Sequence, residues 1–185
     1  MSNILELKKK LSEEVIFPYQ GMIPKLHPSV FMAPGSKIIG DVEIGEASSV
    51  WFNSVVRGDV HYIKIGTYTN IQDCSMLHVT NNKFPLILGN NITVGHSVTL
   101  HGCTISDECL IGMGAIVLDG AKVNKHCIVA AGAVVLQGFE VPEGKVIAGI
   151  PGKIIRDVTE AEILEMEISA KRYFDYAEKT LNSLA

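Results

Sequence analysis

Three of the six histidines in this 185-residue chain are spaced so that their imidazoles could meet. His78 and His101 each directly follow a leucine, Leu77 or Leu100, and His96 lies between them. Imidazole is a common zinc ligand, and three histidines with an open fourth position are typical of catalytic rather than structural zinc. The alternative is that these are ordinary polar side chains on a surface, so the elements that carry them must decide.

A six-residue hydrophobic period organises most of the chain. Small residues stand four positions after many of the periodic aliphatic residues, and Gly or Asn often stands three positions after them. This pattern predicts a short strand with an inward aliphatic side chain, followed by a turn. The longest unbroken series is Ile105, Ile111, Val117, Val123, Val129, Val135, Val141 and Ile147. The same spacing continues upstream in blocks separated by three shifts of phase.

Strands this short cannot bury a face alone, so copies must stack into a β-solenoid with coils about 4.8 Å apart. If each coil is triangular, three walls of six residues give about 18 residues per coil. Leu77 and Leu100 are 23 positions apart, so they lie in neighbouring coils if residues 79–87 contain a five-residue loop. On this register His78 and His101 point the same way from adjacent rungs, where two imidazoles can share a metal.

His96 falls on the preceding wall, around a corner from His78 and His101. A site with all three histidines therefore needs either ligands that straddle one corner or a parallel symmetric trimer. In the trimer, His78 and His101 of one subunit face His96 of the next. The same count places Arg57 in the column of His78 and His101, and Asp73 directly beneath His96. Buried or interfacial Arg and Asp need partners, which favours a built polar site over a chance pattern.

The composition fits a globular chain with a narrow core. Hydrophobic residues make up 47% and charged residues 19%, but aromatic residues are only 6%. The net charge of −4 argues against a nucleic acid or an anionic membrane as partner. No apolar run approaches the roughly 20 residues that span a bilayer, and no signal-peptide pattern is present, so we expect a cytoplasmic location. Four cysteines without a CxxC pair are expected to be reduced: Cys74, Cys103, Cys109 and Cys127.

A long amphipathic helix is predicted at the C-terminal end, over residues 158–183. Thr159 and Glu162 have the spacing of a capping box. The apolar residues that follow lie on one helical face, so the helix is expected to pack on the solenoid, with a partner-binding helix as the alternative. These residues are Ile163, Met166, Ala170, Phe174, Ala177 and Leu181. The first 15 residues favour a short helix within an N-terminal segment of residues 1–27.

Four motifs together resemble the gamma-class carbonic anhydrase family of hexapeptide-repeat proteins. The motifs are Arg57-Gly58-Asp59, Asn70-Ile71-Gln72-Asp73, Leu77-His78 and Gly95-His96-Ser97-Val98-Thr99-Leu100-His101-Gly102. The resemblance covers about residues 28–152. It implies an all-β domain, a left-handed parallel β-helix, that assembles as a homotrimer with metal sites at the subunit interfaces.

The resemblance also implies a reaction and its metal. His78, His96 and His101 match the family's ligands, with Zn²⁺ expected and Fe²⁺ or Co²⁺ as alternatives. The implied reaction is reversible hydration of CO2 to bicarbonate by a metal-bound hydroxide.

Five further residues match the family's motifs around the metal. The resemblance makes Arg57 and Asp59 an ion pair between subunits. It makes Gln72 the hydrogen-bond partner of the metal-bound water or hydroxide, Asp73 its orienting neighbour, and Asn70 a nearby polar residue. In the family's archaeal prototype a glutamate stands at the position of Val60, so proton transfer here needs another group. His61 is the nearest candidate, although a solvated loop histidine is the alternative.

Two other functions are compatible with the same solenoid. Hexapeptide-repeat acyltransferases use a histidine base with coenzyme A or acyl-carrier substrates, and the segment of residues 148–153 resembles a tail that both groups share. Acyl transfer needs one base and no metal, which the three-histidine pattern disfavours. A non-catalytic, metal-stabilised trimeric scaffold is the second alternative.

Overall fold

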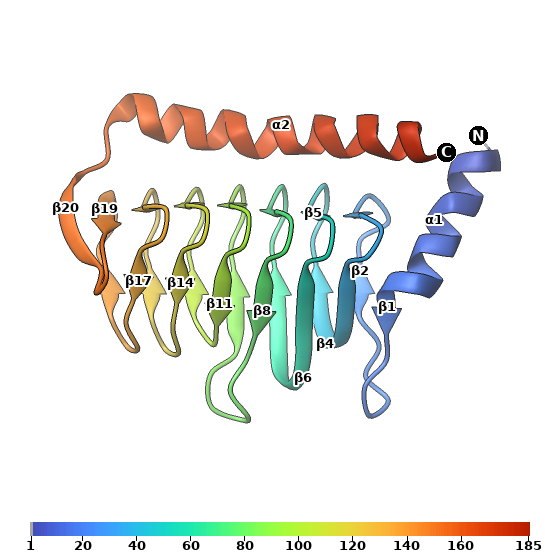
Figure 1. Cartoon of the computed structure of the whole chain (residues 1–185), viewed down its shortest axis with the longest axis horizontal. Helices are drawn as coiled ribbons and strands as arrows, with labels where there is room; N and C mark the ends of the chain where they lie inside the picture. The colour runs from blue at the N-terminus through green and yellow to red at the C-terminus, as the bar shows by residue number, and fades with distance from the viewer. Residues whose placement is uncertain (1) are drawn as a thin grey trace.

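Short parallel strands stack coil on coil into a left-handed parallel β-helix (Figure 1). The computed structural model describes residues 2–185, with helix α1 (Ser2–Val15) at the N-terminal end and helix α2 (Glu160–Leu184) along one side. The strands form three ladders, here called walls 1, 2 and 3, so each coil turns three corners. The predicted fold class is confirmed.

The walls are defined by their strand pairings. Wall 1 contains β3 (Phe31–Met32), β5 (Ser49–Val50), β7 (Asn70–Ile71), β10 (Thr93–Val94), β13 (Leu110–Ile111), β16 (Ile128–Val129), β19 (Lys145–Ala148) and the antiparallel β20 (Lys153–Asp157). Wall 2 contains β1 (Ile16–Phe17), the first parts of β4 (Lys37–Ile44) and β6 (Val55–Ile65), and β8 (Met76–His78), β11 (Thr99–His101), β14 (Ile116–Val117) and β17 (Val134–Val135). Wall 3 contains β2 (Lys25–Leu26), the second parts of β4 and β6, and β9 (Leu86–Leu88), β12 (Thr104–Ile105), β15 (Lys122–Val123) and β18 (Glu140–Val141).

The solenoid extends beyond the expected residues 28–152 at both ends. β1 and β2 already pair with β4, and β20 folds back on β19. A single strand of two residues is weak alone, but here each adds to a ladder that is already present.

The core consists of the periodic aliphatic residues. Ile71, Leu77, Leu100 and Val117 are fully buried. Cys103, Cys109 and Cys127 are buried among them as small core residues. Burial raises the pKa of the Cys109 thiol to about 12 and raises that of the Cys103 thiol further. These thiols therefore stay protonated at neutral pH and are poor metal ligands.

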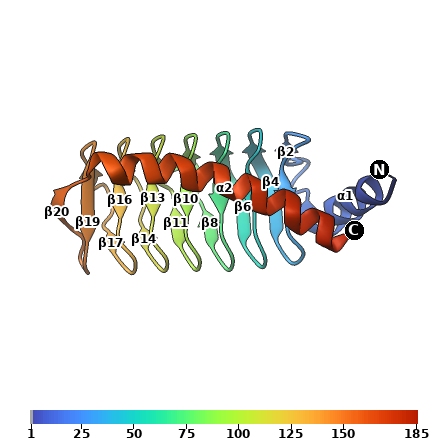
Figure 2. The same cartoon turned by 90° about the horizontal axis from the view of Figure 1, so that it is seen from above.

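The three walls differ in what covers them. Helix α2 runs along the outside of wall 1 (Figure 2) and buries Met166, Ala170 and Ala177 against the solenoid. Trp51 anchors it through an edge-on contact with Tyr173, whose ring centroid is 5.5 Å away. The predicted capping box is present at its start. The helix is therefore part of the domain and not a free partner-binding segment.

Walls 2 and 3 have contrasting outer faces. Wall 3 carries charged side chains such as Lys25, Glu43 and Lys64, which face each other across neighbouring strands. Within residues 2–185 no helix covers wall 2 along most of its length (Figure 1), and although its outer face includes Lys37 and Thr99, six of its outer side chains are apolar. These are Val55, Met76, Ile116, Leu118, Val134 and Leu136.

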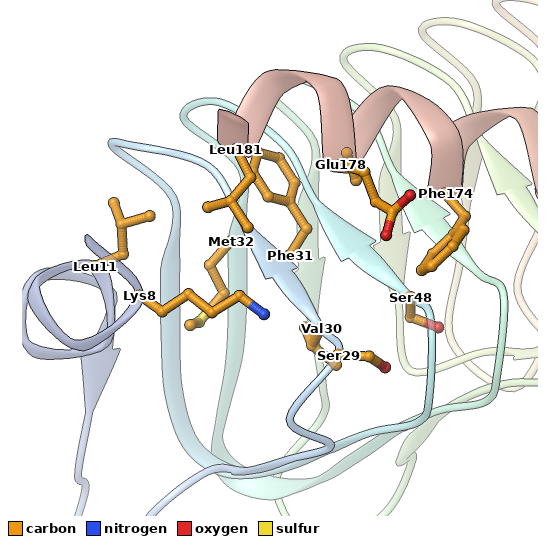
Figure 3. Close-up of a pocket in the computed structure, with 11 residues that line it drawn as sticks. Lys8, Leu11, Ser29, Val30, Phe31, Met32, Ser48, Phe174, Glu178 and Leu181 are labelled. Carbon is orange, nitrogen blue, oxygen red and sulfur yellow. The ribbon is translucent and has the colours of Figure 1, made fainter. Parts of the chain in front are cut away.

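Helix α1 packs across the first coils and meets the end of α2 (Figure 1). A small apolar cavity of about 120 Å³ lies between the two helices and the first coils (Figure 3). Leu11, Phe31, Phe174 and Leu181 are among its lining residues. No helix within residues 2–185 is long and apolar enough to cross a membrane.

Candidate functional site

His78 and His101 lie side by side on the outer face of wall 2. β8 and β11 pair in parallel, with Leu77 opposite Leu100 and His78 opposite His101. The Nδ1 atom of His78 is 3.0 Å from the Nε2 atom of His101. The predicted register, including a loop between β8 and β9, is therefore confirmed.

A carboxylate holds the other ring nitrogen of each of these histidines. The Nε2 atom of His78 is 2.9 Å from Oδ1 of Asp59, and the Nδ1 atom of His101 is 2.7 Å from Oδ1 of Asp119. The second oxygen of Asp119 accepts a hydrogen bond from the Thr80 hydroxyl at 2.9 Å. Carboxylates that bond one nitrogen of an imidazole fix its tautomer and orient the other nitrogen.

His96 lies around the corner, at the end of wall 1, as predicted. Its Nδ1 atom is 2.7 Å from Oδ2 of Asp73 on the coil below. Both side chains are partly open to solvent, at 45% and 33%. The three imidazoles thus share one arrangement, in which a carboxylate occupies one nitrogen, and the opposite nitrogens of His78 and His101 face each other.

One chain does not bring the three histidines together. Residues 2–185 contain no group of three or more His, Cys, Asp or Glu side chains that could hold a metal ion. A single chain supplies the His78–His101 pair and, separately, His96. The hypothesis that ligands of one chain straddle a corner is therefore not met by this geometry.

Asn70 and Gln72 lie on wall 1 beneath helix α2. The Gln72 side-chain amide donates to Oδ1 of Asn70 at 3.1 Å. The Asn70 amide donates in turn to the Thr93 hydroxyl oxygen at 3.1 Å. Because the Gln72 nitrogen is used in this way, its Oε1 atom is the free end of the side chain.

Two of the expected contacts differ from what the resemblance implied. Arg57 and Asp59 form an ion pair within the chain, because residues two apart on β6 share a face, and their pairing between subunits stays a prediction. Asp73 contacts His96, whereas Asn70 is the residue that orients Gln72. Burial opposes ionisation of Asp59, but hydrogen bonds from His78 and Arg57 and the Arg57 charge outweigh it and lower the pKa of Asp59.

The sequence analysis missed Asp119 and its partner Thr80. Asp119 stands 18 positions after His101, one position beyond Leu118, which the next coil places above His101. That spacing was a usable signal, because it places the carboxylate next to the imidazole on the following rung. The contact of Thr80 depends on how the loop before β9 folds back, and the period does not predict it.

Two further cavities adjoin the candidate residues. One, of about 290 Å³, lies between α2 and the corner of His96 and is lined by Trp51, Tyr173 and Tyr176. Burial, together with the Asp73 charge, raises the pKa of Tyr173. The other, of about 460 Å³, is lined mainly by polar residues of β4, β6 and two loops, and includes both Asp59 and His61. His61 therefore opens onto the cavity that reaches Asp59, and its role in proton transfer stays a prediction.

Comparison with known proteins agrees with the repeat. Residues 102–137 match the family described as bacterial transferase hexapeptide (six repeats). A solved structure of a hexapeptide transferase family protein from Anaplasma phagocytophilum superimposes with a TM-score of 0.87 at 39% identity, covering 90% of this chain and 98% of that one.

Two curated relatives are similar to this chain over most of its length. A carbonic anhydrase of Geobacillus kaustophilus is 47% identical over 161 residues, which is 87% of this chain and 88% of the relative. Gamma carbonic anhydrase 2 of Arabidopsis thaliana mitochondria is 45% identical over 160 residues, 84% of this chain. The matched region spans only 58% of that plant protein's length.

Proposed function

Because this chain belongs to the gamma-class carbonic anhydrases, a family of hexapeptide-repeat enzymes, we propose that it catalyses the reversible hydration of CO2 to bicarbonate. We place the reaction at a divalent metal held by His78, His96 and His101. One observation carries the proposal above the others. Each of these imidazoles is bonded to a carboxylate through one nitrogen, which is the usual arrangement of metal-binding histidines.

The residues fit a metal by their chemistry. Three neutral imidazoles leave an open position, which suits Zn²⁺, with Fe²⁺ or Co²⁺ as alternatives. Such an ion supplies a Lewis acid that lowers the pKa of bound water from 15.7 toward about 7. The carboxylates of Asp59 and Asp119 would keep His78 and His101 in the tautomer that offers the pair of facing nitrogens.

Gln72 is the proposed orienting residue for the reacting water. Its amide nitrogen is occupied by Asn70, so its Oε1 atom would accept a hydrogen bond from that water and aim the water oxygen's lone pair at the carbon of CO2. Arg57 would act on the site indirectly, because its contact with Asp59 keeps this carboxylate ionised beside His78. Asp73 would hold His96 in the same way that Asp59 holds His78.

We further propose that the site is completed between copies of the chain. On wall 2, Leu118 lies one coil above His101, and at the corner Met113 lies one coil above His96. Met113 is 60% exposed, which is expected of an apolar side chain that only a neighbouring copy of the chain covers. If wall 2 of one copy packs on the corner of a parallel neighbour, histidine faces histidine and apolar side chain faces apolar side chain.

Two different patches that meet in this way generate a ring rather than a two-fold dimer. A homotrimer is the ring that family membership favours, with three equivalent metal sites. The charged wall 3 would then stay in water, and wall 1 stays beneath α2. The substrates are CO2 and bicarbonate, and we expect no nucleic-acid or membrane partner and a cytoplasmic location.

The alternative activity is acyl transfer, because the similar Anaplasma phagocytophilum protein is named a hexapeptide transferase family protein. It would use coenzyme A or acyl-carrier substrates and one histidine as base, without a metal. A non-catalytic trimer that is stabilised by a bound metal is the remaining alternative.

Metal analysis and stopped-flow CO2 hydration on zinc- and iron-loaded protein test the proposal. We expect about one metal per chain and hydration above the buffer rate. Less than about 0.2 metal per chain after reconstitution would overturn the metal site. Metal without hydration would favour the scaffold, and acetyl-coenzyme A turnover by metal-free protein would favour the acyltransferase.

A further inference from the structure

A buried chain of hydrogen bonds links helix α2 to Gln72. The Thr93 hydroxyl, on β10, donates to Oγ of Ser169 on α2 at 3.5 Å. Thr93 accepts from Nδ2 of Asn70 at 3.1 Å, and Oδ1 of Asn70 accepts from Nε2 of Gln72 at 3.1 Å. Four side chains from three elements therefore form one continuous path that ends at Gln72.

The directions of the two amide hydrogen bonds in this path are determined. The Nδ2 group of Asn70 has two hydrogens, and its second acceptor is the backbone carbonyl of Ile92 at 3.3 Å. A carbonyl cannot donate, so Asn70 must point its nitrogen toward Ile92 and Thr93 and its oxygen toward Gln72. Gln72 then donates with its nitrogen, and its Oε1 atom faces away from Asn70.

Burial strengthens the hydrogen bonds that hold Asn70 and Gln72 in this orientation. Thr93 is 4% exposed, Asn70 2% and Gln72 5%, because α2 covers this part of wall 1. Bulk water does not compete for these groups, and an unsatisfied amide here would lose the full value of its hydrogen bond. An amide flip of Asn70 would put two oxygens, its own and that of Ile92, against each other.

We propose that Thr93 is a positioning residue for the reaction: it holds Asn70, which in turn fixes Gln72 with its acceptor oxygen directed at the reacting water. The inference rests on the proposed function only in the last step, the use of Gln72 Oε1. The preceding step, the hydrogen bond by which Thr93 holds the Asn70 amide in place, can be measured independently of activity.

The test compares Thr93→Val, which keeps the shape but removes the hydroxyl, with Thr93→Ser, which keeps the hydroxyl. Thr104→Val is the matched control, because Thr104 occupies the same repeat position on wall 3 and makes no side-chain hydrogen bond within residues 2–185. Hydrogen exchange of the Gln72 and Asn70 side-chain amides is followed by ¹⁵N NMR in the zinc-loaded protein.

We expect exchange of both amides to be about fivefold faster in Thr93→Val, the ratio that a hydrogen bond of ~1 kcal/mol gives. Thr93→Ser and Thr104→Val should match the wild type. Unchanged amide signals in Thr93→Val would overturn the proposal, as would a Thr93→Ser variant that behaves like Thr93→Val. If Thr93→Val does not fold, Ser169→Ala, which removes the outer partner, should move the same signals in the same direction, and no movement would overturn the proposal.

Kinetics supply the second readout. Thr93→Val should lower kcat for CO2 hydration about fivefold with little change in KM, because orientation of the reacting water is lost while CO2 binding is kept. Equal loss in Thr104→Val would indicate a general effect on packing and overturn the specific role. If no form of the protein hydrates CO2, the proposed function fails, but the amide exchange still decides whether Thr93 orients Gln72.

Discussion

The imidazole of His101 is held by the carboxylate of Asp119, one coil further along the chain, with Nδ1 and Oδ1 2.7 Å apart. Thr80, from the loop before β9, holds the other oxygen of the same carboxylate. This contact ties a proposed ligand of wall 2 to a loop that interrupts the repeat. It also makes Asp119 a residue whose loss should affect the metal more than the fold.

Asp119→Asn should weaken metal retention about 10- to 100-fold, because an amide cannot fix the His101 tautomer as a carboxylate does. Competition with a chelator measures the affinity. Glu108→Gln is the matched control, since Glu108 holds His126 at 2.5 Å on another corner of the solenoid. Equal metal loss in both variants, or none in Asp119→Asn, would contradict the role.

Mixed oligomers test whether neighbouring copies share the site. His78→Ala and His96→Ala chains mixed at random should recover about a quarter of the wild-type sites, because only one of four neighbour pairings supplies all three histidines. His78→Ala mixed with His101→Ala should recover none, because both residues come from the same copy. Metal content of the refolded mixtures is the measurement, and no recovery in the first mixture would refute a shared site.

A charge on the uncovered face of wall 2 should disrupt assembly. Leu118→Glu is expected to give monomers in sedimentation analysis, since a carboxylate would be buried without a partner at the proposed interface. Ser106→Glu is the control, because Ser106 likewise follows an inward residue, Ile105, but on wall 3. An unchanged oligomer in Leu118→Glu would place the interface elsewhere.

Alanine substitutions at Gly102 and Gly114 distinguish the cost of backbone strain from the cost of steric crowding. Both have positive φ, +52° and +69°, but a Cβ at Gly102 would lie 2.7 Å from Cβ of Phe84, whereas one at Gly114 would meet nothing within 4 Å. Gly114→Ala should lower the free energy of unfolding by about 1 kcal/mol, from the left-handed conformation alone. Gly102→Ala should lower it by about 3 kcal/mol, because the loop must also move.

Urea unfolding of the two glycine variants measures the difference. The Gly102 variant should in addition lose metal affinity, because its Cβ would press on the Asp119 carboxylate. Equal destabilisation by both substitutions would mean that the loop gives way without strain.

The start of α2 should confer an acid-sensitive part of the stability. Hydrogen bonds from Arg156, and then from Thr159, lower the pKa of Glu162 to about 2. A lowered pKa in the folded state stabilises the protein above the ordinary pKa of about 4.5, and the effect fades as the pH falls toward 2. The Tm difference between wild type and Glu162→Gln should therefore be full at pH 7 and shrink below pH 4.5. Glu160→Gln, in the same helical turn but without an ion pair within residues 2–185, should show a smaller difference.

The sequence by itself determined the solenoid, the pairing of His78 with His101 and the place of His96 at a corner. A strict six-residue period puts one inward aliphatic residue on each wall, so the phase shifts could be counted and the columns aligned. The capping box at Thr159 likewise depended only on local spacing. These features depend only on residues that are close in the sequence or on the fixed length of the repeat.

Only the tertiary structure decided which wall each outer element covers. The packing of Tyr173 on Trp51 directs α2 to wall 1, and this leaves the apolar face of wall 2 open. The intrachain pair of Arg57 with Asp59 and the contact of Thr80 with Asp119 depend on how a strand and a loop depart from the regular coil. A repeat of fixed length predicts only the contacts that recur from coil to coil. The contacts named here arise where the repeat is interrupted, and there side-chain packing selects one of several arrangements.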